Sequence, residues 1–149
     1  MVWRQFQHPS LWGLLEEKYR CHRLWEASEP EECIKNHCQG ARAMVTDHFG
    51  ANEQLIQQFP KLKCITNFGV GFDTVAVDYA SKKGIQVTNT QDVLTDDVAD
   101  SAIGLLLSVA RSIPEGDSFV REGTGSDRSR RVTERITGEQ VGMLGSGRL

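Results

Sequence analysis

Short apolar segments alternate with amphipathic segments along the first half of the chain. Three of the apolar segments have the length and composition of buried β-strands: residues 43–46, 63–66 and 85–88. The intervening residues 52–59 and 77–83 have the spacing of helices, which Pro60 and Gly84 end. Strands that alternate with helices at this spacing predict βαβ units in an α/β fold with a parallel sheet.

The first forty residues predict two helices and a short strand. Ser10 suits the N-cap of a helix whose apolar stripe comprises Leu11, Leu14, Leu15 and Tyr19. Residues 21–25 have the composition of a short strand. Pro30, followed by two glutamates, indicates the start of a second helix, and Gly40 its end.

Residues 95–113 form the longest periodic segment. Thr95 suits an N-cap, and two aspartates follow in the first turn, where carboxylates favour the helix dipole. Apolar residues cover about half of the circumference, which predicts a helix buried on more than one side. Pro114 should end or kink this helix. Residues 123–135 indicate a solvated loop, in which Arg128, Arg130 and Arg131 suit a basic surface better than a phosphate site.

A glycine-rich turn, Asn-Phe-Gly-Val-Gly-Phe-Asp at 67–73, follows one of the predicted strands. Its two glycines allow a sharp turn, from which the amides of Val70 and Gly71 could point outward to bind an anion such as a substrate carboxylate. A plain turn without a ligand is the alternative. Ligands of parallel sheets bind beyond the carboxyl ends of the strands. We therefore expect three loops, 47–50, 67–73 and 89–95, to line one edge.

Composition narrows the function classes. The chain has 149 residues, 39% hydrophobic and 25% charged, and a net charge of −3, typical of a globular protein without a basic field for nucleic acid. We expect no membrane span, no signal peptide and a cytoplasmic location. The four cysteines have no zinc-site spacing, so we expect reduced thiols and no metal.

The last residues have a second glycine motif. Residues 140–144 predict a buried strand, and Gly145-Ser-Gly147 follows. Such a turn opens the G-x-G-x-x-G motif, which brings a backbone against a dinucleotide pyrophosphate. The third glycine would fall after Leu149, the last residue of the sequence.

Four segments together resemble the D-isomer-specific 2-hydroxyacid dehydrogenase family, nearest to its plant-type hydroxyphenylpyruvate and glyoxylate/hydroxypyruvate reductases: 67–73, 83–90, 93–100 and 141–148. The resemblance implies a flavodoxin-like substrate-binding domain at 1–94. Residues 95–149 would then hold the interdomain helix, a linker and the first elements of a truncated Rossmann domain.

The resemblance also implies roles for single residues. Val70 and Gly71 would hold the substrate carboxylate, and Val70, Thr95, Gly145 and Gly147 would contact NADP or NAD. The catalytic arginine, glutamate and histidine of the family lie beyond the dinucleotide turn, so no catalytic residue is assigned. Arg111 does not correspond to the catalytic arginine. None of the four histidines corresponds to the catalytic histidine: His8, His22, His37 and His48. The Gly-Lys-Trp-like stretch of the family is replaced by residues without tryptophan at 123–131.

Two hypotheses of function follow. The chain is an N-terminal fragment of an NAD(P)H-dependent 2-oxoacid reductase, inactive alone, whose complete form is a homodimer acting on a small 2-oxo or 2-hydroxy acid. Alternatively, it is a non-catalytic binding or dimerisation module, like corepressor members of the family. The particular 2-oxo acid and the choice between NAD and NADP stay open.

Overall fold

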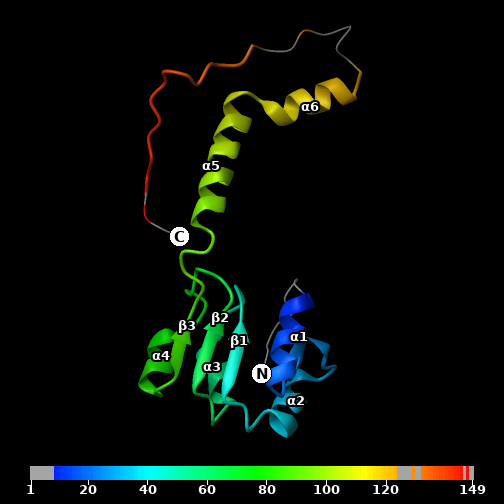
Figure 1. The fold of residues 1–149 in the computed structure, drawn as a ribbon, viewed down its shortest axis with the longest axis vertical. Helices are drawn as coiled ribbons and strands as arrows, with labels where there is room; N and C mark the ends of the chain where they lie inside the picture. Colours follow the sequence, from blue (N-terminus) through cyan, green and yellow to red (C-terminus); the bar gives the residue numbers. More distant parts are fainter. Residues whose placement is uncertain (1–8, 124–128, 130–131, 146, 148–149) are drawn as a thin grey trace. The chain divides into compact units, whose positions relative to one another are not determined.

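The computed structural model describes residues 9–123, 129, 132–145 and 147 (Figure 1). The chain divides into two compact units, residues 1–91 and residues 92–149.

The first unit is built on a parallel sheet of three strands, β1 (Ala43–Thr46), β2 (Cys64–Asn67) and β3 (Gln86–Thr88). Their order is β1-β2-β3, so β2 lies in the centre. Ile65 of β2 pairs with Met44 on one side and Val87 on the other. All three strands lie within one residue of their predicted positions, which confirms the α/β class and the parallel sheet.

Helices connect the strands and cover the core. The helix α3 (Glu53–Gln57) lies between β1 and β2 in sequence, and α4 (Val77–Lys82) lies between β2 and β3 and packs against β3. Asn52 caps α3, since its side chain accepts a hydrogen bond of 2.9 Å from the Leu55 amide. One cluster of buried side chains joins these elements: Leu24, Ile34, Cys38, Met44, Ala51, Leu55, Ile56, Phe59, Leu62, Ile65, Val75, Ala80 and Ile85.

The first helix differs from its prediction. The helix α1 (Pro9–Lys18) includes Ser10, which is therefore not its N-cap. The predicted apolar stripe is also wrong in part, because Leu14 is 57% and Tyr19 is 65% exposed. Trp12 is buried instead, with Leu15 and Trp25 packed against it. A large aromatic side chain buries more apolar surface than leucine, which explains why this face of α1 turns inward.

The predicted strand at 21–25 is wrong. Residues Leu24–Glu26 form a 3₁₀ helix, η1, which buries Leu24. Salt bridges hold Arg23 to Glu16 at 2.6 Å and to Glu26 at 3.1 Å, and together with the burial of Leu24 they favour a tight turn over an extended segment. The helix α2 (Pro30–His37) begins at the predicted proline and ends before Gly40, with Cys38 as its C-cap.

The second unit contains α5 (Thr95–Ala110) and α6 (Ile113–Arg121). Thr95 is the first helical residue of α5, and the N-cap is Leu94. Ser112 adopts a left-handed conformation with φ of +46°, which ends the helical path after α5. Pro114 lies in the first turn of α6, where proline needs no amide hydrogen bond, so it helps to begin a second helix.

Two expectations of burial in the second unit are wrong. No residue of α5 is buried within the described structure, although its sequence predicts burial on more than one side. Residues 140–144 form no strand, and Val141 and Met143 are exposed. A strand requires a neighbour for its amides and carbonyls, and the described residues place none beside this segment. The predicted basic loop at Arg128, Arg130 and Arg131 lies outside the described residues.

A search of the described residues for a membrane-crossing helix found none of sufficient length and apolar character.

Candidate functional site

The glycine turn begins where the central strand of the sheet ends, as predicted from the sequence. Asn67 is the last residue of β2, and the Phe68 amide donates a hydrogen bond of 2.7 Å to the Thr46 carbonyl at the end of β1. A further bond of 2.9 Å, from the Val75 amide to the Phe72 carbonyl, closes the turn just before α4. The turn is therefore fixed at both ends to the framework of the first unit.

Three successive carbonyls of the turn accept hydrogen bonds. The Gly69 carbonyl accepts from the Thr90 amide at 3.1 Å, and the Val70 carbonyl accepts from Asn89 Nδ2 at 2.8 Å. Asn67 Nδ2 donates to the Gly71 carbonyl at 2.7 Å and to the Gly69 carbonyl at 3.5 Å. Two predicted loops, 67–73 and the start of 89–95, are therefore in direct contact.

The amides of Val70 and Gly71, the residues predicted to bind substrate, donate no hydrogen bond within the described part of the chain. Val70 is half-buried and Gly71 is exposed. A Cβ added to Gly71 would meet only Asp73 Oδ2, at 3.8 Å, so the space around this backbone is open. Two adjacent donors without partners, beside an open surface, can bind one carboxylate.

The third predicted loop, 47–50, contacts the segment that follows the glycine turn. The Ala51 amide donates to the Thr74 carbonyl at 3.1 Å, and the Ala76 amide donates to the Ala51 carbonyl at 2.9 Å. Inside the loop, Thr46 Oγ1 donates to the Gly50 carbonyl at 2.6 Å. Asp47 Oδ1 accepts from the Phe49 amide at 3.0 Å. The buried Asp47 side chain therefore stabilises the conformation of its own loop.

The proposed cofactor residues Thr95, Gly145 and Gly147 lie in the second unit, and Val70 in the first. Thr95 Oγ1 is buried and has no hydrogen-bond partner among the described residues. Gly145 has φ of +83°, a glycine conformation, but no strand precedes it. The two glycines therefore lack the strand-to-turn setting that forms a phosphate cradle, and Ser146 between them lies outside the described residues.

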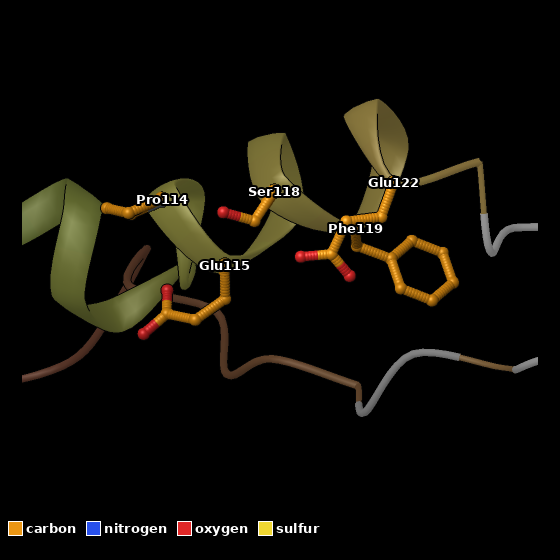
Figure 2. A pocket seen from close by; sticks show the side chains of 5 residues that line it. All are labelled: Pro114, Glu115, Ser118, Phe119 and Glu122. Carbon is orange, nitrogen blue, oxygen red and sulfur yellow. The ribbon is translucent and has the colours of Figure 1, made fainter.

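Other candidate sites have less suitable chemistry. A hollow of about 390 Å³ along α6 is lined by the residues of Figure 2: Pro114, Glu115, Ser118, Phe119 and Glu122. Its two glutamates would repel an anionic substrate, and no cationic side chain lines it. Within the described ranges, no group of three or more His, Cys, Asp or Glu side chains could hold a metal ion.

Asn67 and Asn89 belong to the predicted loops of this edge, but the sequence alone indicates no role for either side chain. The signal that could have found them is their position, since each lies at the carboxyl end of a strand or immediately after it. A side chain there can reach the carbonyls of a neighbouring loop.

The parallel α/β unit and the glycine turn beyond its central strand are typical of dehydrogenases that bind an organic acid at the edge of a sheet. The match to a known protein family, given next, agrees with a dehydrogenase. The family described as D-isomer specific 2-hydroxyacid dehydrogenase, catalytic domain, matches residues 3–144, and the chain belongs to this family. The family consists of NAD(P)-dependent oxidoreductases.

Curated relatives include two plant enzymes. A glyoxylate/hydroxypyruvate reductase A of Arabidopsis thaliana and a hydroxyphenylpyruvate reductase of Plectranthus scutellarioides are each 39% identical over 136 residues. Each match covers 91% of this chain and 44% of the relative. The resemblance to plant-type reductases is confirmed, and the chain spans less than half the length of these relatives.

Solved structures share the fold. The NADPH-dependent glyoxylate/hydroxypyruvate reductase of Sinorhizobium meliloti, in complex with NADP and malonate, is 31% identical with a TM-score of 0.82. That match covers 97% of this chain and 45% of the other. A 2-hydroxyacid dehydrogenase of Ketogulonicigenium vulgare is 32% identical with a TM-score of 0.78, over 91% and 43% of the two chains.

Proposed function

We propose that this chain is the N-terminal, substrate-binding part of a reductase that interconverts a 2-oxo acid and a D-2-hydroxy acid. The substrate class is that of glyoxylate, hydroxypyruvate and hydroxyphenylpyruvate, on which the relatives named above act. The observation that carries the proposal is the turn beyond β2, in which the Val70 and Gly71 amides have no partner among the described residues.

In this proposal the two amides bind the carboxylate that all 2-oxo acids share. Backbone donors fixed by the sheet need no reorganisation when the anion arrives, which favours binding of one defined orientation. The rest of the acid would extend along the edge formed by the three loops. NAD(P)H, when bound, supplies the hydride, and residues 95–149 would begin the part of the protein that holds this cofactor, with Val70 and Thr95 among its contacts.

Carboxylate binding can be tested with the chain as it exists. In a ¹⁵N-labelled sample, malonate should shift the amide resonances of Val70 and Gly71 in a saturable manner. Malonamide, which has a similar size and no charge, is the control and should leave them unchanged. Shifts of equal size with both compounds, or malonate shifts confined to other residues, would contradict the proposed site.

A measurement of reductase activity distinguishes the proposed fragment from a complete enzyme. The chain contains no residue assigned as the proton donor, and hydride transfer to a carbonyl needs one. Mixed with NADPH or NADH and hydroxypyruvate, the purified chain should leave nicotinamide absorbance at the level of a blank without protein. Consumption of the reduced cofactor above that blank would show that the chain carries its own catalytic group.

A role as a binding or dimerisation module is the second candidate. The exposed apolar side chains of α5 favour it. The occupant of that face would be a second copy of the same chain.

A further inference from the structure

We propose that Asn67 and Asn89 are positioning residues, which aim the Val70 and Gly71 amides at the substrate carboxylate by holding the carbonyls on the opposite side of the turn. This inference rests on the proposed function for the identity of the ligand. The positioning itself is a property of the protein without ligand, so it can be tested separately.

The argument begins with the planar peptide group. In a trans peptide the carbonyl of one residue and the amide of the next lie in one plane and point in opposite directions. No cis peptide occurs among the described residues. The Gly69 carbonyl therefore shares a plane with the Val70 amide, and the Val70 carbonyl shares a plane with the Gly71 amide. A hydrogen bond that fixes either carbonyl also fixes the direction of the amide behind it.

Asn89 fixes the second of these planes. Its Nδ2 lies 2.8 Å from the Val70 carbonyl oxygen, an ordinary distance for a good hydrogen bond. Asn89 follows β3, which pairs with β2 in the sheet, so the donor comes from a framework separate from the turn itself. The Gly71 amide is thereby directed away from the Asn89 side chain.

Asn67 holds the turn from inside. Its side chain is fully buried, and Nδ2 reaches the Gly71 carbonyl at 2.7 Å and the Gly69 carbonyl at 3.5 Å. The shorter contact is the stronger one, and the Thr90 amide at 3.1 Å is the main donor to Gly69. The Gly69 carbonyl shares a plane with the Val70 amide, and the Gly71 carbonyl shares a plane with the Phe72 amide. Asn67 therefore adds to the hold of Thr90 on the Val70 amide and fixes the chain on the far side of Gly71.

Packing alone does not explain an asparagine at the buried position 67. Its Oδ1 is buried and has no hydrogen-bond partner among the described residues. An orphaned acceptor destabilises a fold, so a leucine of similar size would serve the core better. The amide is explained by its two donor contacts, which neither leucine nor aspartate could make.

The test uses variants of similar size that carry no charge, because an added carboxylate would itself repel the anion. Asn89→Leu and Asn67→Leu each remove the donor. Thr88→Val is the matched control, since it removes the 3.1 Å hydrogen bond to Thr66 Oγ1 beside the same edge without touching the turn. Two quantities are measured for each protein: the ¹H–¹⁵N heteronuclear NOE of Val70 and Gly71 without ligand, and the Kd for malonate.

Asn89→Leu should lower the NOE of Gly71 more than that of Val70 and raise the Kd for malonate at least tenfold. Thr88→Val should change neither quantity more than twofold. An unchanged Kd for malonate in Asn89→Leu would overturn the inference, and so would an unchanged NOE. If Asn67→Leu fails to fold, as judged by circular dichroism, Asn89→Leu decides alone, because Asn89 is only half-buried.

The two proposals fail in different ways. If malonate does not bind the unmodified chain at Val70 and Gly71, the proposed function is wrong. The NOE of Val70 and Gly71 in the free protein then still tests whether the two asparagines fix the turn. A lowered NOE in the asparagine variants would then support it, and an unchanged NOE would refute it. If malonate binds and both variants bind it equally well, the site stands and the positioning role is wrong.

Discussion

Gly50 lies directly against the backbone of Thr74: a Cβ added to Gly50 would be 2.1 Å from the Thr74 carbonyl oxygen. Gly50 also has φ of +67°, a conformation that residues with a side chain rarely adopt. This close approach lets the loop after β1 join the segment before α4 through the Ala51–Thr74 hydrogen bond. The position of the loop after β1, one of the three loops of the proposed site, depends on it.

Gly50→Ala should therefore be strongly destabilising. The left-handed conformation and the clash together should lower the free energy of unfolding by about 2–4 kcal/mol, measured by urea denaturation. Gly84→Ala is the matched control, because Gly84 has φ of +69° and open space around the added Cβ. It should cost only about 1 kcal/mol, from the conformation alone. Equal losses in the two variants would show that the contact with Thr74 is unimportant.

The cap of α3 gives a second prediction. Asn52→Ala removes the acceptor of the Leu55 amide and should lower the free energy of unfolding by about 1 kcal/mol. Asn36→Ala, at an exposed position inside α2, is the control and should be neutral or slightly stabilising, because alanine favours helices. The prediction is wrong if both asparagines can be replaced at the same cost.

Cys38 gives a prediction for pH. Burial, followed by the neighbouring Cys33 thiol, raises the pKa of Cys38 from 9.0 to about 11. The folded protein thus keeps a proton that the unfolded chain loses above pH 9. The stability that this protonated thiol contributes is complete below pH 9 and decreases as the pH rises toward 11.

The measurement compares the unmodified protein with Cys38→Val, which fills the site with a group that does not ionise. The difference in unfolding free energy between the two proteins should move in favour of Cys38→Val between pH 8 and pH 10.5. Ile34→Val is the control, because it changes a buried side chain of α2 that does not ionise, and its effect on the unfolding free energy should be constant with pH. A difference that is constant with pH would mean that Cys38 ionises alike in the folded and unfolded chains.

The sequence predicts the central unit well because its signals are local. Apolar runs of four residues, such as 43–46, have few alternatives to a buried strand when helices and turn residues flank them. The glycine turn after β2 is predictable for the same reason, since two glycines that follow an apolar run indicate a change of direction of the chain.

The errors concern contacts between distant residues. The apolar run 140–144 resembles 43–46 in composition, but a strand forms only where a partner strand lies beside it. Residues 21–25 depend on a salt bridge to Glu16 and on the burial of Leu24, neither of which has a local signal. The hydrogen bond from Asn89 to the Val70 carbonyl joins residues 19 positions apart. It forms only because β2 and β3 pair in the sheet, so no local signal in the sequence predicts it.

The helix α5 gives the last prediction. It exposes large apolar side chains on several sides within the described structure: Val98, Ile103, Leu105, Leu106, Leu107 and Val109. No charged residue occurs from Ser101 to Ala110. Burial of one such side chain is worth about 1.5–3 kcal/mol, so covering even three of them would offset a large part of the cost of association. A second copy of the chain presents the same uncharged surface, and we expect the chain to self-associate through α5.

Size-exclusion chromatography with light scattering should show a dimer or a larger species whose mass increases with concentration. The double variant Leu106→Lys/Leu107→Glu should shift the protein to a monomer, because burial of these charges in an apolar interface is costly. Gln54→Glu/Gln57→Lys is the matched control: it adds the same two charges at exposed positions of α3 and should leave the mass unchanged. A monomer at every concentration would show that α5 is covered within one chain. A dimer that survives the α5 variant would place the interface elsewhere.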